Sequence, residues 1–211
     1  MSIAIDQLQP GPVHGREEHQ SYGPVARALH WLVFVLVAAQ VVVGWTMPHI
    51  RRGTPQEGLV DWHLSIGAVL MLVVVVRLLW RLRHPTPLTT TMAPWERMIA
   101  KLTHELLYGV LLVLPILGWA AANYFGYTVR LFGLLPLPAL ADNSVEWAHQ
   151  AGDLHAALTW GLLGLVGLHV VGALWHHFLR RDRVLRRMLP GIYPSRCSLT
   201  FSGHSIRSRQ R

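Results

Sequence analysis

Four long apolar stretches dominate the chain, and polar or proline-containing segments separate them. Each stretch reaches the roughly 20 residues that a helix needs to cross the hydrocarbon core of a bilayer. The stretches cover residues 29–47, 62–80, 103–122 and 154–178. This pattern predicts an all-α protein, a transmembrane four-helix bundle.

Capping and turn residues mark the ends of the predicted helices. Ser21 is a candidate N-cap, and Pro24 falls in the first turn of the first helix. Pro85 and Pro87 follow the second stretch and are expected to stop that helix. Pro115 lies inside the third stretch, where membrane helices tolerate proline because their neighbours satisfy the freed backbone groups.

A long connection, residues 123–153, joins the third stretch to the fourth. Its first part, residues 124–140, is too apolar to be a flexible linker. We expect it to form an interfacial lid or a short surface helix that covers the outer end of the bundle.

The composition agrees with a membrane protein, since 52% of the residues are hydrophobic and only 14% are charged. A net charge of +8 is also typical of nucleic-acid binding, but the positions of the basic residues argue against it. If the N-terminus is inside, only three of the 19 Lys and Arg residues face outward: Arg51, Arg52 and Arg130. The positive-inside rule therefore predicts that both termini are cytoplasmic.

We divide the chain into a cytoplasmic N-terminal extension (residues 1–22), a four-span domain (residues 23–190) and a basic tail (residues 191–211) that we expect to be disordered. The first 23 residues lack a basic region followed by an apolar run, so they do not resemble a cleaved signal peptide. The single Cys197 excludes an intrachain disulfide and offers no cysteine cluster for iron–sulfur or c-type haem attachment.

Five of the 13 histidines lie within or beside the apolar stretches: His30, His63, His104, His155 and His169. His155 and His169 are fourteen residues apart on one predicted helix, which is about 21 Å of rise and four turns less about 40°. They therefore share one face at two depths. A lone histidine there would most simply bond to a neighbouring helix, but five together indicate a function, because burying an unpaired polar ring is costly.

Each histidine of the last stretch has a candidate partner at its own depth. His63 opens its stretch from the outer side, as His155 does, while His30 and His104 compete as partners of His169 near the inner side. Depth slightly favours His30. Neutral imidazoles are natural ligands of haem iron, so the pattern predicts two bis-histidine haems stacked across the membrane, and hence electron transfer. The spacing does not fit a compact zinc site.

Arg77 lies fourteen residues inward of His63. It would either pair with a propionate of the inner haem or extend its charge to the cytoplasmic surface. Arg130 is a weaker candidate for the propionates of the outer haem or for an anionic substrate. Glycines near the histidines would leave room for a flat macrocycle or let the helices pack closely: Gly67, Gly161, Gly164, Gly167 and Gly172.

Several short motifs together resemble the bacterial cytochrome b561 family over residues 22–190. The motifs are Arg27-Ala28-Leu29-His30-Trp31-Leu32, Trp62-His63-Leu64-Ser65-Ile66-Gly67, Val76-Arg77-Leu78-Leu79-Trp80-Arg81-Leu82 with Pro85-Thr86-Pro87, Ala100-Lys101-Leu102-Thr103-His104, Leu114-Pro115-Ile116-Leu117-Gly118, Leu154-His155-Ala156, Gly167-Leu168-His169 and Trp175-His176-His177. The resemblance implies an inner-membrane cytochrome with two haems b. The family pattern would place one haem between His30 and His169, and it thereby favours His30 over His104. It would place the other haem between His63 and His155.

The resemblance also implies a leading function, the oxidation of superoxide at the periplasmic side with electrons passed to ubiquinone. Iron with two axial imidazoles has no free position for dioxygen, so the transfer would be outer-sphere. One alternative is a cytochrome b anchor subunit that passes electrons between quinone and a partner dehydrogenase or hydrogenase. Another is a haemless structural protein or transporter. The sequence assigns no catalytic residue.

Overall fold

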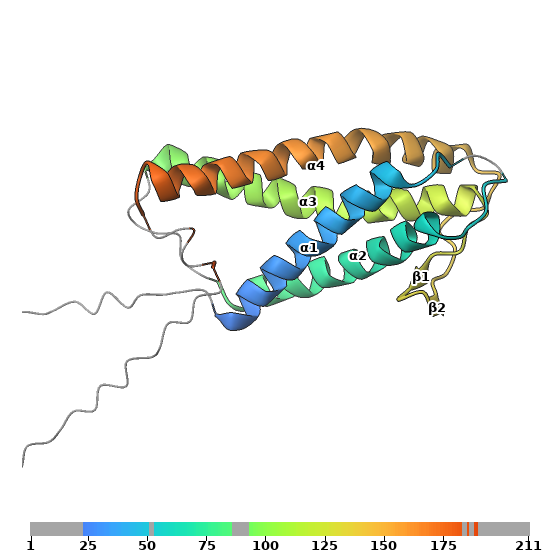
Figure 1. Cartoon of the computed structure of the whole chain (residues 1–211), viewed down its shortest axis with the longest axis horizontal. Helices are drawn as coiled ribbons and strands as arrows, with labels where there is room; N and C mark the ends of the chain where they lie inside the picture. The colour runs from blue at the N-terminus through green and yellow to red at the C-terminus, as the bar shows by residue number, and fades with distance from the viewer. Residues whose placement is uncertain (1–22, 51–52, 86–92, 183–184, 186–187, 190–211) are drawn as a thin grey trace, which may run out of the picture.

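The fold is a bundle of four long helices. The computed structural model describes residues 23–50, 53–85, 93–182, 185 and 188–189. The elements are α1 (Pro24–Thr46), α2 (Leu59–Arg83), α3 (Pro94–Tyr124), β1 (Arg130–Leu131), β2 (Leu135–Pro136) and α4 (Glu146–Phe178). α3 and α4 run along the long axis of the molecule and α1 and α2 are inclined to it (Figure 1), and all four helices are long and apolar enough to cross a membrane. The predicted all-α four-helix class is confirmed.

We name the two ends of the bundle after the predicted topology. The outer end carries the α1–α2 connection and the long α3–α4 connection, and the inner end carries the α2–α3 connection (Figure 1). The N-terminal extension, the basic tail, Ser21, Pro87 and Cys197 lie outside the described residues.

Every helix extends beyond the apolar stretch that predicted it. α3 begins at Pro94 and α4 at Glu146, so polar residues continue both helices past the hydrocarbon length. The start of α3 is stabilised by Glu96, whose carboxylate accepts the backbone N–H of Ala93 at 3.0 Å. α1 begins at Pro24 with Gly23 as its N-cap residue, and no side chain caps it. α3 continues without interruption through Pro115.

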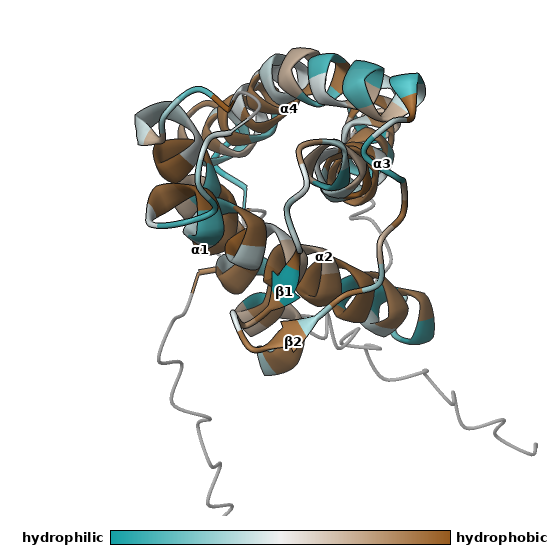
Figure 2. Ribbon diagram, turned by 90° about the vertical axis from the view of Figure 1, so that its right-hand side faces the viewer, coloured by the Kyte–Doolittle hydropathy of each residue, from teal (hydrophilic) through white to brown (hydrophobic). Residues whose placement is uncertain are grey.

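The helices pack as two pairs. α1 packs on α2, α3 packs on α4, and α2 joins the pairs by packing on α3, as the view along the bundle in Figure 2 shows. Within the described chain, no Cα atom of α1 lies within 8 Å of one of α4. α1 and α4 therefore meet only through side chains, along a seam between the two pairs.

The buried core consists of two clusters, and most other apolar surface faces outward. The outer cluster comprises Val60, Leu64, Ala68, Ala122, Tyr127 and Val129, and the inner cluster comprises Val33, Leu70 and Val74. Helices that are apolar on all sides are either buried in a large protein or span a membrane. A four-helix bundle with so few buried positions fits the second case.

The α3–α4 connection packs on the outer end, but as a short hairpin and not as a surface helix. Tyr127 and Val129 are buried in the outer cluster beside α2. After them, β1 pairs antiparallel with β2, with Leu131 opposite Leu135. The hairpin lies at the rim, beside α2, and not over the centre of the bundle (Figure 2). The prediction of a surface helix was wrong because the apolar residues here pack on α2 as extended chain.

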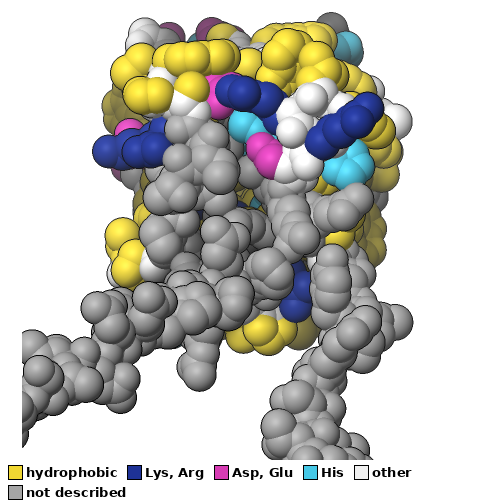
Figure 3. Space-filling view, turned by 90° about the vertical axis from the view of Figure 1, so that its left-hand side faces the viewer, with side chains coloured by type: hydrophobic (Ala, Val, Ile, Leu, Met, Phe, Trp, Pro, Cys, Tyr) yellow, Lys and Arg dark blue, Asp and Glu magenta, His cyan; other side chains and the backbone are white. Residues whose placement is uncertain are grey.

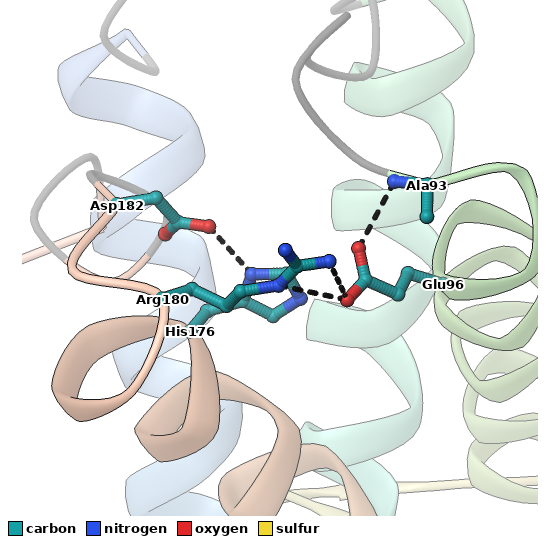
Figure 4. A network of polar contacts seen from close by, with 5 residues as sticks. All are labelled: Ala93, Glu96, His176, Arg180 and Asp182. Carbon is teal, nitrogen blue, oxygen red and sulfur yellow. Dashed lines mark hydrogen bonds and ion pairs between the residues drawn. The ribbon is translucent and has the colours of Figure 1, made fainter.

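Polar contacts hold the helices together at the inner end. Charged and histidine side chains gather on this face (Figure 3). Arg180, just after α4, donates two hydrogen bonds to the buried carboxylate of Glu96 on α3, and His176 pairs with Asp182 (Figure 4). The chain after α4 then reaches α1, where the indole N–H of Trp31 donates to the Met188 carbonyl oxygen at 2.8 Å.

Candidate functional site

The structure brings both predicted histidine pairs together. The ring centroids of His63 and His155 lie 6.1 Å apart, and those of His30 and His169 also lie 6.1 Å apart. Imidazole nitrogens bind transition metals at about 2.0–2.1 Å, so two rings that bind one ion from opposite sides have centres roughly 6 Å apart. Each pair therefore has a spacing that would let its two rings hold one metal ion between them.

His155, on α4, is held in the form that a metal ligand requires. Its Nδ1 lies 2.8 Å from the carbonyl oxygen of Leu114 on α3. A carbonyl oxygen only accepts, so Nδ1 carries the proton and Nε2 keeps its lone pair in the neutral ring. Such a bond from the second nitrogen commonly orients a ligating histidine.

Gly118, one turn after Leu114, makes room for this ring. A Cβ atom at Gly118 would stand 3.0 Å from both Cε1 and Nδ1 of His155. Any larger residue would therefore push the imidazole away from its carbonyl partner.

His63, on α2, lies against a glycine of the neighbouring helix α1. A Cβ atom at Gly44 of α1 would stand 3.3 Å from Cε1 of His63. The amide of Gln40 donates to the His63 carbonyl oxygen at 2.9 Å, and Gly67 leaves space for that amide. Each outer histidine thus lies against a glycine on an adjacent helix.

A cavity of about 570 Å³ surrounds the outer pair. All four helices contribute to its lining, which includes His63 and His155 together with Gln40 and Trp119. Oε1 of Gln40, Nδ1 of His63 and Nε1 of Trp119 are buried, and none has a hydrogen-bond partner among the described residues. Because buried polar atoms are nearly always partnered, and because cavities of this size hold small-molecule cofactors, the site fits a large ligand such as haem.

The inner pair is surrounded by further polar groups. The ring of His104, on α3, lies 5.1 Å from that of His169, and its Nδ1 is 2.6 Å from the Ala100 carbonyl oxygen of its own helix. Both candidate partners predicted for His169 are therefore close to it, and His30 has the wider, ligand-like spacing.

Arg77 points into the bundle at this level. Its Nε donates to the Tyr108 hydroxyl at 3.0 Å, and its Nη1 lies 3.3 Å from Nδ1 of His30. Arginine has only donors, so Nδ1 of His30 accepts this bond and the proton sits on Nε2. The spacing of the inner pair fits haem, provided that Arg77 gives up this bond so that His30 can present a lone pair.

The remaining candidates divide between the cavity and its surroundings. Arg130 is exposed at the base of the hairpin and is not among the residues that line the cavity. His49 and His149, which the sequence places in outer loops, do line it. A Cβ atom at the glycines of α4 that were expected to admit a macrocycle would meet nothing within 4 Å: Gly161, Gly164, Gly167 and Gly172.

The sequence did not single out several residues that shape the outer site. Gly44 and Gln40 stand in no motif, Trp119 fits a membrane-interface position, and Gly118 and Leu114 belong to a motif that assigns them no role. The available signal was a glycine inside each apolar stretch. That signal is weak because small residues are common in membrane helices for packing alone.

Known proteins resemble this chain over nearly all of the described region. A family model described as prokaryotic cytochrome b561 matches residues 21–191. Cytochrome b561 homolog 2 of Escherichia coli (strain K12) is 32% identical over 172 residues, 81% of this chain and 92% of the relative. The probable superoxide oxidase CybB of Yersinia pestis is 29% identical over 176 residues, 82% of this chain and 97% of the relative. Cytochrome b561 homolog 1 of Escherichia coli (strain K12) is 30% identical over 170 residues, 77% and 93% of the two chains.

Proposed function

We propose that this chain, which belongs to the prokaryotic cytochrome b561 family of membrane electron-transfer proteins, holds two haems b at two depths of its bundle. The outer haem would be bound by His63 and His155, and the inner one by His30 and His169. When bound, each haem supplies one-electron transfer between ferrous and ferric iron. The protein supplies the distance between the haems, insulation from water and control of the reduction potentials.

The observation that carries this proposal is the environment of the outer pair. The Leu114 carbonyl oxygen holds His155 with Nε2 unprotonated, and the ring centroids of His155 and His63 are 6.1 Å apart. Both rings line a cavity that contains buried polar atoms without a hydrogen-bond partner among the described residues. Three independent features therefore favour a ligand bound between the two rings. A histidine that served only helix packing would not need the cavity.

At the inner level, Arg77 is the residue expected to recognise a propionate. It lies beside the ring of Tyr108, and the guanidinium of Arg81 is 5.8 Å from the centroid of the same ring. Two guanidinium groups beside Tyr108, of which that of Arg77 lies 3.3 Å from His30, favour an anion in this part of the bundle. Pairing with a propionate would also release Nδ1 of His30 from Arg77.

The proposed location is the bacterial inner membrane, with both termini in the cytoplasm. This orientation rests on the arginines and the lysine at the inner ends of the helices, such as Arg81, Arg83, Arg97 and Lys101. The outer cavity, with His49 and His149 in its lining, would then face the periplasmic side.

We propose superoxide as the electron donor and ubiquinone as the acceptor, which the name of the Yersinia pestis relative supports on the donor side. Two superoxide anions would each lose one electron and leave as dioxygen, while one ubiquinone would gain two electrons and two protons to become ubiquinol. A lipid-soluble quinone would enter along the seam between α1 and α4, where no backbone contact closes the bundle, although Trp45 and Trp160 fill part of it with ring centroids 6.2 Å apart.

The test uses the purified protein in proteoliposomes containing ubiquinone. Superoxide generated outside the vesicles should be consumed with formation of ubiquinol in a ratio of two to one. A haem-containing protein that is not reduced by superoxide and copurifies with a dehydrogenase or hydrogenase would overturn this donor and favour the anchor-subunit alternative.

A further inference from the structure

The β1–β2 hairpin folds back along α2 toward the middle of the membrane. A Cβ atom at Gly133, in the turn, would lie 4.0 Å from Oγ of Ser65. Ser65 is the seventh residue of α2, about 9 Å from its start. The 25 residues of α2 span about 37 Å, against roughly 30 Å of hydrocarbon. The turn thus lies about 5 Å below the outer edge of the hydrocarbon if α2 is centred.

The two faces of the hairpin differ in their environment. Leu131 and Leu137 pack against the outer core cluster. Phe132, Leu134 and Leu135 are instead 64%, 84% and 59% exposed. A contiguous exposed apolar surface of this kind marks an interaction site rather than ordinary surface.

The backbone of the turn is built to present these side chains. Phe132 has a φ of 54°, a left-handed conformation that is uncommon for a bulky residue. The turn is closed by the N–H of Leu134, which donates to the Leu131 carbonyl oxygen at 3.1 Å. Positive φ at both central residues, Phe132 and Gly133, is typical of a two-residue hairpin turn.

We propose that the hairpin is embedded in the outer leaflet of the bilayer, where lipid acyl chains cover Phe132, Leu134 and Leu135. α2, on which β1 packs, also exposes large apolar side chains at its outer end, among them Leu59 and Trp62. Arg130, exposed at the base of the hairpin, would then lie at the level of the lipid phosphates. The hairpin would hold the outer cavity at a fixed depth relative to the membrane surface.

Spin labelling tests this placement directly. A nitroxide is attached at Leu134→Cys in a Cys197→Ser background, in proteoliposomes of phosphatidylethanolamine and phosphatidylglycerol. Leu72→Cys, on the exposed side of α2, is the lipid reference, and Asn143→Cys, in the exposed α3–α4 connection, is the water reference. Circular dichroism verifies that each variant retains its helices.

The label at position 134 should collide with oxygen as often as the lipid reference, and with a water-soluble nickel chelate several-fold less often than the water reference. Collision with the nickel chelate at the level of the water reference would overturn the proposal. Protection from both reagents would also overturn it, since a second copy or a partner protein would then cover the hairpin.

A charge substitution gives a second, label-free measurement. Leu134→Asp should lower the melting temperature in vesicles, because a carboxylate is costly in hydrocarbon. Asn143→Asp is the matched control and should melt as the unmodified protein does. Equal melting temperatures for the two variants would contradict a membrane-embedded hairpin.

Discussion

His155 and Gly118 are packed so closely that a Cβ atom at Gly118 would stand 3.0 Å from the imidazole ring. The glycine lets α4 bring its histidine against α3, where the carbonyl oxygen of Leu114 accepts a hydrogen bond from Nδ1–H. Helix packing and the protonation state of a proposed ligand are therefore set by the same contact.

Replacing Gly118 should remove the outer haem selectively. Gly118→Val would overlap the ring and force His155 off the Leu114 carbonyl oxygen, at a cost of about 1–3 kcal/mol for overpacking. The haem-to-protein ratio is expected to fall from two toward one. Gly161→Val is the matched control, because a Cβ atom at Gly161 meets nothing within 4 Å, and it should keep both haems. Two haems in Gly118→Val would refute the proposed role of the contact.

His30 and His104 should respond differently to substitution. The ring of His30 lies 6.1 Å from that of His169, the spacing expected of two rings that bind one ion from opposite sides, whereas that of His104 lies at 5.1 Å. We expect His30→Ala to lose the inner haem and His104→Ala to retain both, measured by pyridine haemochrome content. The opposite pattern would make His104 the ligand.

Arg77 should tune the inner haem alone. The positive charge of a guanidinium near a propionate stabilises the reduced haem relative to the oxidised haem, which carries one more positive charge. Arg77→Gln is therefore expected to lower the reduction potential of the inner haem by roughly 60 mV, which is a tenfold change for a one-electron couple. Arg77→Lys should restore part of the difference, and Arg83→Gln, at the exposed inner end of α2, should change neither potential. An unchanged potential in Arg77→Gln would mean that the side chain does not pair with a propionate. Potentiometric titration followed by absorbance measures both haems.

Trp31 should matter for the inner site because it connects α1 to the chain after α4. α1 and α4 carry His30 and His169, yet in the described structure these two helices meet only through side chains. Trp31→Phe removes the hydrogen bond to Met188 and should cost about 1 kcal/mol. On heating, the inner haem is expected to dissociate earlier than in the unmodified protein, with the outer haem unaffected. The exposed Trp62 is the control, and Trp62→Phe should show no such change.

The sequence predicts the fold and the outer histidine pair for a simple physical reason, whereas depth alone leaves His30 and His104 both open as partners of His169. A membrane helix needs about 20 apolar residues, and a fixed rise per residue places His155 and His169 at two depths on one face. Depth along an axis is a one-dimensional property, and it can be read from residue numbers. The pairing of His63 with His155 follows from it.

The rest depends on how the helices turn toward one another, which spacing along one helix does not determine. Leu114 and Gly118 meet His155 only because α3 and α4 pack in one particular rotation. The sequence allows the guanidinium of Arg77 to lie either at the inner surface or inside the bundle. Only its contact with Tyr108 distinguishes the two positions. The sequence did not predict the hairpin because the apolar residues of 124–140 fit a surface helix and a packed extended chain equally well.

The haem-to-protein ratio of His63→Ala and His169→Ala tests the central claim most directly. The account predicts two haems b in the unmodified protein and one in each variant, with the remaining haem keeping its own reduction potential. A purified protein without haem, or variants that both retain two haems, would contradict it.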